Sequence, residues 1–182
     1  KIHALVAKLN ADGLIVHVNP FQEWLQPEGD HFRNSPLETI QKLLELVDYQ
    51  IIVKEVGQGM GPESIKALLK LPIAALDFGA YGGTNFSRLE LLRSSQQHAS
   101  LYRDLAYIGH TAVEMTGFVN AAVDTLGADL KCKEVIISGG IGGFLDGYYG
   151  MEKVALNSIY GQGSAFLKPA QQDYQALKTY IE

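Results

Sequence analysis

Polar side chains able to bind a ligand follow a short apolar run near the start of the chain. Residues 13–16 (Gly-Leu-Ile-Val) form a run that is bounded by glycine and proline, a pattern typical of a buried strand. An imidazole, two amides and a carboxylate come just after it, from His17, Asn19, Gln22 and Glu23. Ligand chemistry in α/β sheets and barrels is found at the carboxyl ends of the strands. These four residues are therefore candidates for a binding site.

A lysine ends the next apolar run. Lys54 follows residues 51–53 (Ile-Ile-Val), and Glu55 follows it directly. Because side chains alternate along a strand, Lys54 and Glu55 should point to opposite faces, so only one of them can face a central site. A buried ammonium there could face an electron-rich cofactor or a developing negative charge. The alternative is a surface lysine paired with Glu55.

Glycine-rich loops follow the later apolar runs. Residues 138–143 (Ser-Gly-Gly-Ile-Gly-Gly) and 161–164 (Gly-Gln-Gly-Ser) follow the last two, and residues 79–85 (Gly-Ala-Tyr-Gly-Gly-Thr-Asn) follow the third. Backbone N–H groups in such loops bind phosphate in barrels, and glycine lets the backbone approach the anion. One such loop alone could equally be a tight turn, but two at successive strand ends favour phosphate binding.

Short apolar runs alternate with helical patterns along the chain. The predicted strands are residues 14–18, 51–56, 73–77, 134–138 and 158–161. A helix is predicted over residues 35–47, where Ser35 can cap it and Pro36 suits its first turn, and a longer one over residues 111–126. This alternation predicts a parallel sheet with right-handed crossovers.

Five such units are too few to close an eight-stranded barrel, which takes about 250 residues. The sheet is therefore open, or about three units precede Lys1 in a longer polypeptide. A polar or glycine-rich loop follows every predicted strand, which favours the barrel, because an open sheet concentrates its ligand at one switch point. We predict that residues 1–182 are the C-terminal portion, about the last five βα units, of a single TIM (β/α)8 barrel domain.

Composition excludes several other classes. The chain has 182 residues, of which 47% are hydrophobic, with 15 basic and 20 acidic residues and no basic block. It therefore offers no electrostatic footprint for nucleic acid or for an anionic membrane surface. The single Cys132 excludes an internal disulfide framework, and no apolar stretch is long enough to span a bilayer. We expect a cytoplasmic protein.

Taken together and in order, these motifs resemble type 2 isopentenyl diphosphate isomerase, the flavin-dependent form, over essentially the whole chain. The resemblance rests on residues 17–23 (His-Val-Asn-Pro-Phe-Gln-Glu), 26–30 (Gln-Pro-Glu-Gly-Asp), 52–57 (Ile-Val-Lys-Glu-Val-Gly), 82–86 (Gly-Gly-Thr-Asn-Phe) with Glu90, and 138–141 (Ser-Gly-Gly-Ile). The family's N-terminal basic motif, which grips the diphosphate, has no counterpart in these residues. Many members also carry a basic residue where Gly142 stands.

The resemblance implies a role for each matching residue. Lys54 and Thr84 would contact FMN. Its phosphate would be held by the glycine-rich turns at Gly140, Ile141, Gly142, Gly163 and Ser164.

On the substrate side, the resemblance implies that His17, Asn19 and Gln22 line the pocket. Glu23 would bind the Mg²⁺ that bridges to the diphosphate, which agrees with the preference of Mg²⁺ for carboxylate and phosphate oxygens. Gln22 and Glu90 match positions that assist proton movement near the flavin, and they would be the catalytic pair.

The implied reaction interconverts isopentenyl and dimethylallyl diphosphate by adding one proton and removing another. An alkene is a poor base, and ordinary side chains titrate in the wrong range to protonate it easily, so the resemblance assigns this work to reduced FMN. NAD(P)H would serve only to reduce the flavin. The family also implies a homo-oligomer, a tetramer or larger.

Two other classes remain open at this point. One is a different FMN- or phosphate-binding barrel oxidoreductase, which would keep the phosphate turns without needing Gln22, Glu23 and Glu90 together. The other is a non-catalytic, truncated barrel.

Overall fold

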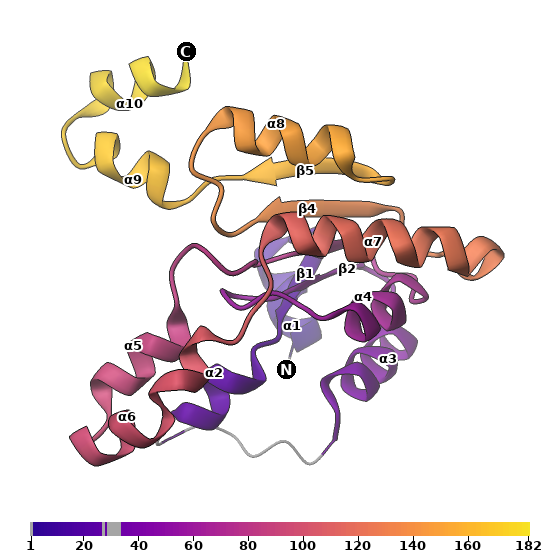
Figure 1. Ribbon diagram of the computed structural model, residues 1–182. Helices are drawn as coiled ribbons and strands as arrows, with labels where there is room; N and C mark the ends of the chain where they lie inside the picture. The colour runs from indigo at the N-terminus through magenta and orange to yellow at the C-terminus, as the bar shows by residue number, and fades with distance from the viewer. Residues whose placement is uncertain (1, 27, 29–33) are drawn as a thin grey trace.

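The computed structural model describes residues 2–26, 28 and 34–182 (Figure 1). The five strands are β1 (Gly13–His17), β2 (Gln50–Lys54), β3 (Ala75–Asp77), β4 (Glu134–Ser138) and β5 (Asn157–Gly161). The α-helices are α1 (Ile2–Leu9), α2 (Pro20–Leu25), α3 (Pro36–Leu46), α4 (Pro62–Leu69), α5 (Phe86–Arg93), α6 (Gln96–Tyr102), α7 (Ala112–Leu126), α8 (Phe144–Lys153), α9 (Ser164–Ala170) and α10 (Tyr174–Ile181). Two short 3-10 helices, η1 (Arg103–Tyr107) and η2 (Gly127–Asp129), complete the described elements.

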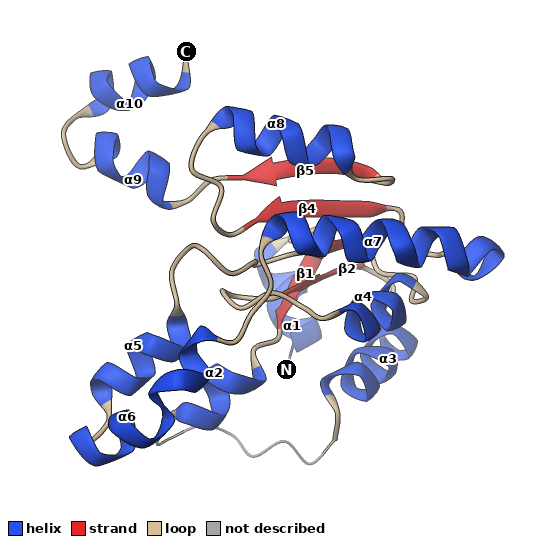
Figure 2. Ribbon diagram, viewed as in Figure 1, coloured by secondary structure: helices blue, strands red, loops and turns tan. Residues whose placement is uncertain are grey.

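All five strands are parallel and form one sheet in the order β1-β2-β3-β4-β5 (Figure 2). Each strand therefore lies beside the strand that precedes it in the chain, and helices connect them. A doubly wound sheet would reverse its strand order at a switch point, and this sheet does not. The arrangement is that of part of a (β/α)8 barrel, which confirms the predicted fold class.

Side chains on the two faces of the sheet have different surroundings. On the outer face, Val53, Leu76 and Ile137 are fully buried in the core that the sheet forms with α4 and α7. On the inner face, the register pairs Ile15 with Ile52 and Ile136 with Ile159, and the two pairs lie at different levels of the sheet. Ile15 and Ile159, on the first and last strands, are 58% and 62% exposed. The inner face is therefore the side that a closed barrel would bury.

Local signals in the sequence set the main helix starts. The Ser35 side chain caps α3 by accepting a hydrogen bond from the Glu38 backbone N–H at 3.2 Å, and Pro36 occupies the first turn. Thr111 and Glu114 form a reciprocal capping box at the start of α7. Both predicted helices are confirmed.

Two of the helices that the sequence analysis did not predict begin beside a polar side chain that accepts backbone hydrogen bonds. Helix α2 begins directly after Asn19, whose side chain caps it, and Pro20 starts its first turn. Helix α8 forms in a glycine-rich segment, where the Asp146 carboxylate accepts hydrogen bonds from the backbone N–H groups of Gly142 and Gly143. In both cases one polar side chain satisfies the free N–H groups of the first turn, which outweighs the weak helical propensity of the segment.

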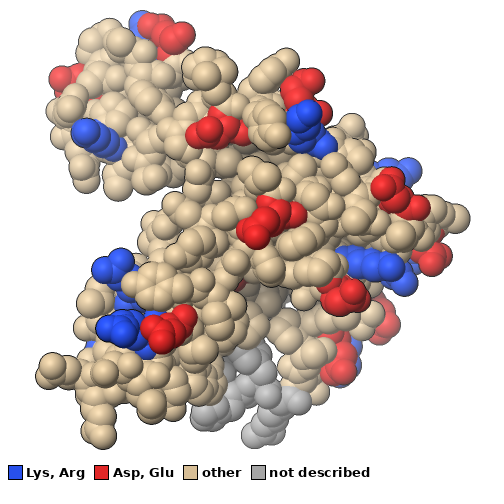
Figure 3. Space-filling view, in the orientation of Figure 1, with Lys and Arg blue, Asp and Glu red and all other residues tan. Residues whose placement is uncertain are grey.

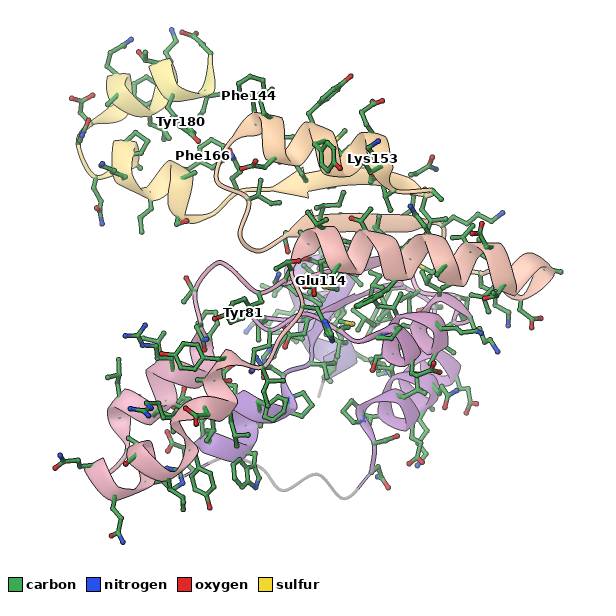
Figure 4. All side chains as sticks on the ribbon, viewed as in Figure 1. Tyr81, Glu114, Phe144, Lys153, Phe166 and Tyr180 are labelled. Carbon is green, nitrogen blue, oxygen red and sulfur yellow. The ribbon has the colours of Figure 1, made fainter. Side chains whose placement is uncertain are left out.

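Helices α9 and α10 pack against each other as a hairpin at the C-terminal end. The rings of Phe166 and Tyr180 meet edge to face, with their centroids 5.3 Å apart (Figure 4). Within the described part of the chain, no helix is both long and apolar enough to cross a membrane.

The loops after β2 and β3 are in close backbone contact. Gly79 has φ +49°, and a Cβ at this position would overlap with the backbone carbonyl of Glu55. The backbone N–H groups of Gly57 and Gly59 both donate to the Gly79 carbonyl, at 2.7 and 3.2 Å. Only glycine satisfies the backbone angle and the contact together.

The Glu55 carboxylate holds the loop after β2 from its buried side. Glu55 is 4% exposed, and its Oε2 accepts hydrogen bonds from the backbone N–H groups of Gly57, Gln58 and Gly59 at 2.7 to 2.8 Å. Burial raises the pKa of Glu55 above its ordinary value of 4.5, and the N–H donors offset only part of that rise.

We predict that Gly79→Ala lowers the free energy of unfolding by about 3 kcal/mol, because it adds both backbone strain and a clash. Urea denaturation measures the change. The control is Gly117→Ala in α7, where a Cβ meets nothing within 4 Å, so that substitution should stabilise by about 0.5–1 kcal/mol. Equal effects of the two changes would contradict the described loop contact.

We predict that Glu55→Gln makes the protein less sensitive to pH on the acid side of neutrality. With a raised pKa, folded Glu55 holds its proton at pH values where the unfolded chain has released it. Stability therefore falls as pH rises from about 4.5 through the raised pKa. Glutamine does not ionise, so the variant lacks this loss of stability. The free energy of unfolding of the variant, relative to that of the wild type, should therefore be higher at about pH 7 than at about pH 4, as measured by denaturation at both pH values. The opposite trend would show that the N–H donors outweigh burial.

Candidate functional site

A cavity of about 370 Å³ lies at the carboxyl ends of the strands, and we call it the strand-end cavity. The loops after β2, β3, β4 and β5 all contribute to it. Its walls include Lys54, Thr84, Gly140, Ile141, Gly163 and Ser164. The structure therefore brings together six of the seven residues that the sequence predicted to bind a cofactor. The seventh, Gly142, lines an adjacent hollow of about 350 Å³, which shares Ser164 with the strand-end cavity.

The cation of the cavity comes from the end of β2. Lys54 is half-buried and lines the cavity, where its Nζ donates to the Asp77 carboxylate at 3.0 Å. Glu55 points to the opposite face, into the packing beneath the loop. The alternation expected from the strand is thus observed, and Lys54 is the member of the pair that faces the site. The alternative Lys54–Glu55 surface pair does not form.

The turn after β4 approaches the loop after β3 closely. Gly139 and Gly140 have φ values of +86° and +71°, and a Cβ on Gly140 would lie 3.2 Å from the Cα of Gly82. Positive φ in successive residues lets glycine loops present backbone N–H groups to an anion. A cavity with a cation at one wall, a hydroxyl from Thr84 and such a turn fits a phosphate-bearing flavin.

Two of the predicted substrate residues lie at the carboxyl end of β1: His17 is its last residue, and Asn19 follows two positions later. His17 pairs with Lys54 in the parallel register, so both side chains belong to the inner face. Asn19 is buried, and its Oδ1 accepts from the Gln22 backbone N–H at 2.9 Å. Its Nδ2 is buried as well and has no hydrogen-bond partner among the described residues. A buried amide N–H₂ without an acceptor is costly and suits a ligand oxygen.

The predicted catalytic pair is brought together across 68 positions of sequence. Gln22 Nε2 lies 3.4 Å from Glu90 Oε1, and Gln26 Nε2 donates to the same oxygen at 3.1 Å. Arg93 donates to the other oxygen, Oε2, at 2.7 Å. Glu90 is only 5% exposed, so it is not the solvated helix residue that its sequence position alone would suggest. Helices α2 and α5, which carry these residues, are packed against each other.

The predicted magnesium ligand, Glu23, belongs to no cluster of three or more ligating side chains among the described residues. Glu23 is half-buried in the first turn of α2. In the described residues, no three His, Cys, Asp or Glu side chains gather closely enough to hold a metal ion. Phosphate oxygens of a ligand would suit a Mg²⁺ ion at Glu23, because Mg²⁺ in proteins is commonly bound by one or two carboxylates together with substrate phosphates. Three residues of the 26–30 motif, Pro27, Gly29 and Asp30, lie outside the described residues.

Two structural groups thus make up the candidate site. The strand-end cavity gathers the predicted cofactor residues, and the α2–α5 pair gathers the predicted catalytic ones. Phe86, the first residue of α5, lines the cavity and links the two groups. Figure 3 shows a notch between the lobe of α9 and α10 and the lobe of α2, α5 and α6, and it shows basic and acidic side chains interspersed. The view displays no large patch of one charge.

Sequence reasoning missed three residues that hold this site. Asp77 contacts Lys54, while Gln26 and Arg93 contact Glu90. For Asp77 a signal was present, because a carboxylate at the end of the fully buried strand β3 needs a partner. Gln26 belongs to the 26–30 motif but was given no role, and Arg93 gave no signal, since polar residues at helix ends are ordinarily solvated.

Comparison with known proteins identifies a consistent set of relatives. The chain is 31% identical to "Isopentenyl-diphosphate delta-isomerase" of Ignicoccus hospitalis over 100% of the chain and 49% of the relative. It is 30% identical to the protein of the same name from Rickettsia felis over 98% of the chain and 49% of the relative. A Bacillus pumilus protein of that name is 44% identical over 54% of the chain and 27% of its own length. No protein-family model matches.

The chain spans about half the length of the curated relatives it matches. The agreement extends over nearly the whole chain, and the length of the relatives fits the type 2 form. The chain is therefore related to the isopentenyl-diphosphate delta-isomerases of type 2, as its motifs predicted, and it corresponds to about half of such a protein.

Proposed function

We propose that residues 1–182 are the C-terminal portion of a single FMN-binding (β/α)8 barrel, and that the protein interconverts isopentenyl and dimethylallyl diphosphate. The observation that carries this proposal is the convergence of Lys54, Thr84 and the glycine turns after β4 and β5 on one cavity. The same residue types, in the same order, gave the sequence its resemblance to the type 2 isomerase.

The open form of the sheet supports the barrel. Strands β1 and β5 each have one hydrogen-bonded neighbour in the described sheet, and Ile15 and Ile159 expose most of their side chains on the inner face. An apolar sheet face is usually covered by another element of the fold. Three further strands between β5 and β1 would close the sheet over this face and complete eight strands.

The cofactor side of the proposal assigns a task to each wall of the strand-end cavity. Lys54 and Thr84 bind and orient the ring system, while Gly140, Ile141, Gly142, Gly163 and Ser164 hold the phosphate. When bound and reduced, FMN supplies an acid and base strong enough for an unactivated alkene, and NAD(P)H serves as its reductant. Lys54 contributes a fixed positive charge in a partly desolvated position, where such a charge acts strongly.

The substrate side rests on α2 and the loop before it. In this proposal, His17, Asn19 and Gln22 line the pocket that binds the substrate. The buried Nδ2 of Asn19 can donate a hydrogen bond to a diphosphate oxygen or to an oxygen of the flavin ring. Glu23 binds Mg²⁺, whose remaining ligands are diphosphate oxygens and water. Anchoring the diphosphate in this way fixes the alkene against the cofactor and excludes water from the reacting carbons.

Gln22 and Glu90 assist proton movement near the alkene. Glu90 is suited to this task because three donors, from Gln22, Gln26 and Arg93, fix its two oxygens. A carboxylate held in this way stays in one orientation. We further propose that the protein forms a homo-oligomer and that it is located in the cytoplasm.

The first prediction for this function is a double-bond shift that depends on reduced flavin. Proton NMR of isopentenyl diphosphate with the intact protein, Mg²⁺ and FMN should show dimethylallyl methyl signals with reduced FMN only, without stoichiometric flavin reoxidation. Reoxidation in step with product would favour a barrel oxidoreductase instead. If FMN binds but isopentenyl diphosphate is not converted, the protein is not an isomerase. If FMN does not bind, the barrel is non-catalytic.

The second prediction concerns Glu23→Gln. It should weaken Mg²⁺-dependent binding of the diphosphate substrate about tenfold or more, because the metal loses its charged protein ligand, while FMN affinity changes little. Calorimetry with substrate and flavin fluorescence measure the two affinities. Glu45→Gln, an exposed substitution on α3 with the same change of charge, is the control. Equal loss of both affinities in Glu23→Gln would mean that Glu23 is structural.

A further inference from the structure

Three side chains form a hydrogen-bonded row across the carboxyl ends of β2, β3 and β4. Lys54 Nζ donates to Asp77 Oδ2 at 3.0 Å, and Ser138 Oγ donates to Asp77 Oδ1. The backbone N–H of Gly79 in turn donates to Ser138 Oγ at 3.0 Å. Asp77 therefore uses both carboxylate oxygens and joins the cation of the strand-end cavity to the residue that opens the turn after β4.

The register of the sheet places these three residues at neighbouring positions on one face. Lys54 and Asp77 are direct partners in the β2–β3 pairing, and Ser138 follows the Asp77 partner Ile136 by two positions. Because side chains alternate, all three project from the inner face at the same end of the sheet. All three residues belong to strands, so no flexible loop is needed to bring them together.

Asp77 and Lys54 differ in how deeply their side chains are buried. The side chain of Asp77 is 10% exposed, whereas that of Lys54 is 32% exposed. Lys54 and Ser138 line the strand-end cavity, whereas Asp77 is not among its lining residues. A buried ion pair is weak evidence for stability, because an apolar pair of similar volume often serves as well. Holding a cation in a defined position is the use for which a buried pair is suited.

We propose that Asp77 is a positioning residue for Lys54: it holds the ammonium at the wall of the strand-end cavity and, through Ser138, couples it to the phosphate turn. The consequence for the cofactor rests on the proposed function, in which Lys54 contacts FMN. A lysine side chain without such a partner samples many rotamers and would lose that freedom on binding. Asp77 removes this cost in advance, and preorganisation of this kind increases affinity.

The first test is a double-mutant cycle on FMN affinity in the intact protein, measured by quenching of flavin fluorescence. Asp77→Asn keeps the shape of the side chain and removes its charge, so we expect about tenfold weaker binding. In a Lys54→Met background, the same change should cost no affinity, because there is no ammonium left to position. If Asp77→Asn weakens FMN binding by the same factor with and without Lys54, the two effects are independent. This result would overturn the proposal and make Asp77 merely structural.

The control for this cycle is Asp124→Asn, an exposed residue on α7 with the same change of charge. It should leave FMN affinity unchanged. If Asp77→Asn fails to fold, Ser138→Ala takes its place, since it frees one oxygen of Asp77 and leaves the ion pair intact. We then expect a loss of about threefold that again disappears in the Lys54→Met background; a loss that persists there would overturn the proposal.

The second test needs no cofactor, so it separates this proposal from the proposed function. ¹³C relaxation at Cε of Lys54 reports motion of the side chain on the picosecond to nanosecond timescale. Lys54 should be rigid in the wild type and mobile in Asp77→Asn, while Lys153, whose Nζ lies 5.6 Å from the Tyr149 ring centroid, stays unchanged. An equally rigid or equally mobile Lys54 in both proteins would overturn the positioning role. If the relaxation changes as expected but the wild type does not bind FMN, the proposed function fails and the positioning role stands.

Discussion

The parallel register of the five strands is the constraint on which the site depends. Each strand lies beside its predecessor, so residues at the same level of neighbouring strands become neighbours in space. This register makes His17 the neighbour of Lys54, and Lys54 the neighbour of Asp77, across β1, β2 and β3. A slip of one residue in any pair would turn its side chains to the opposite face and remove the cation from the cavity.

The loops at the strand ends depend on that register in turn. Gly79 fits against the carbonyl of Glu55 only because β2 and β3 end at the same level. Glu55 then fixes the first loop from the buried side with three backbone hydrogen bonds. The last residue of β2 and the residue after it thus have different roles: Lys54 lines the cavity, and Glu55 supports the loop.

Much of the site could be predicted from the sequence because its signals are local. Apolar runs bounded by glycine and proline marked the strands, and the strand over residues 134–138 was predicted with both boundaries correct. Residues that cap helices, such as Ser35 and Thr111, marked the helix starts. The helical state of residues 20–25 was missed, because a segment of six residues is too short to show a periodicity that distinguishes a helix from a loop.

The sequence by itself determined the alternation of strands and helices, the polar residues at the strand ends and the glycine turns, because each follows from side-chain periodicity or backbone freedom within a few residues. Only the tertiary structure decided that Lys54 rather than Glu55 faces the cavity, that Asp77 joins Lys54 to Ser138, and that Glu90 is buried against Gln22. Those contacts join residues up to 68 positions apart. They arise from strand register and helix packing, which local periodicity does not encode.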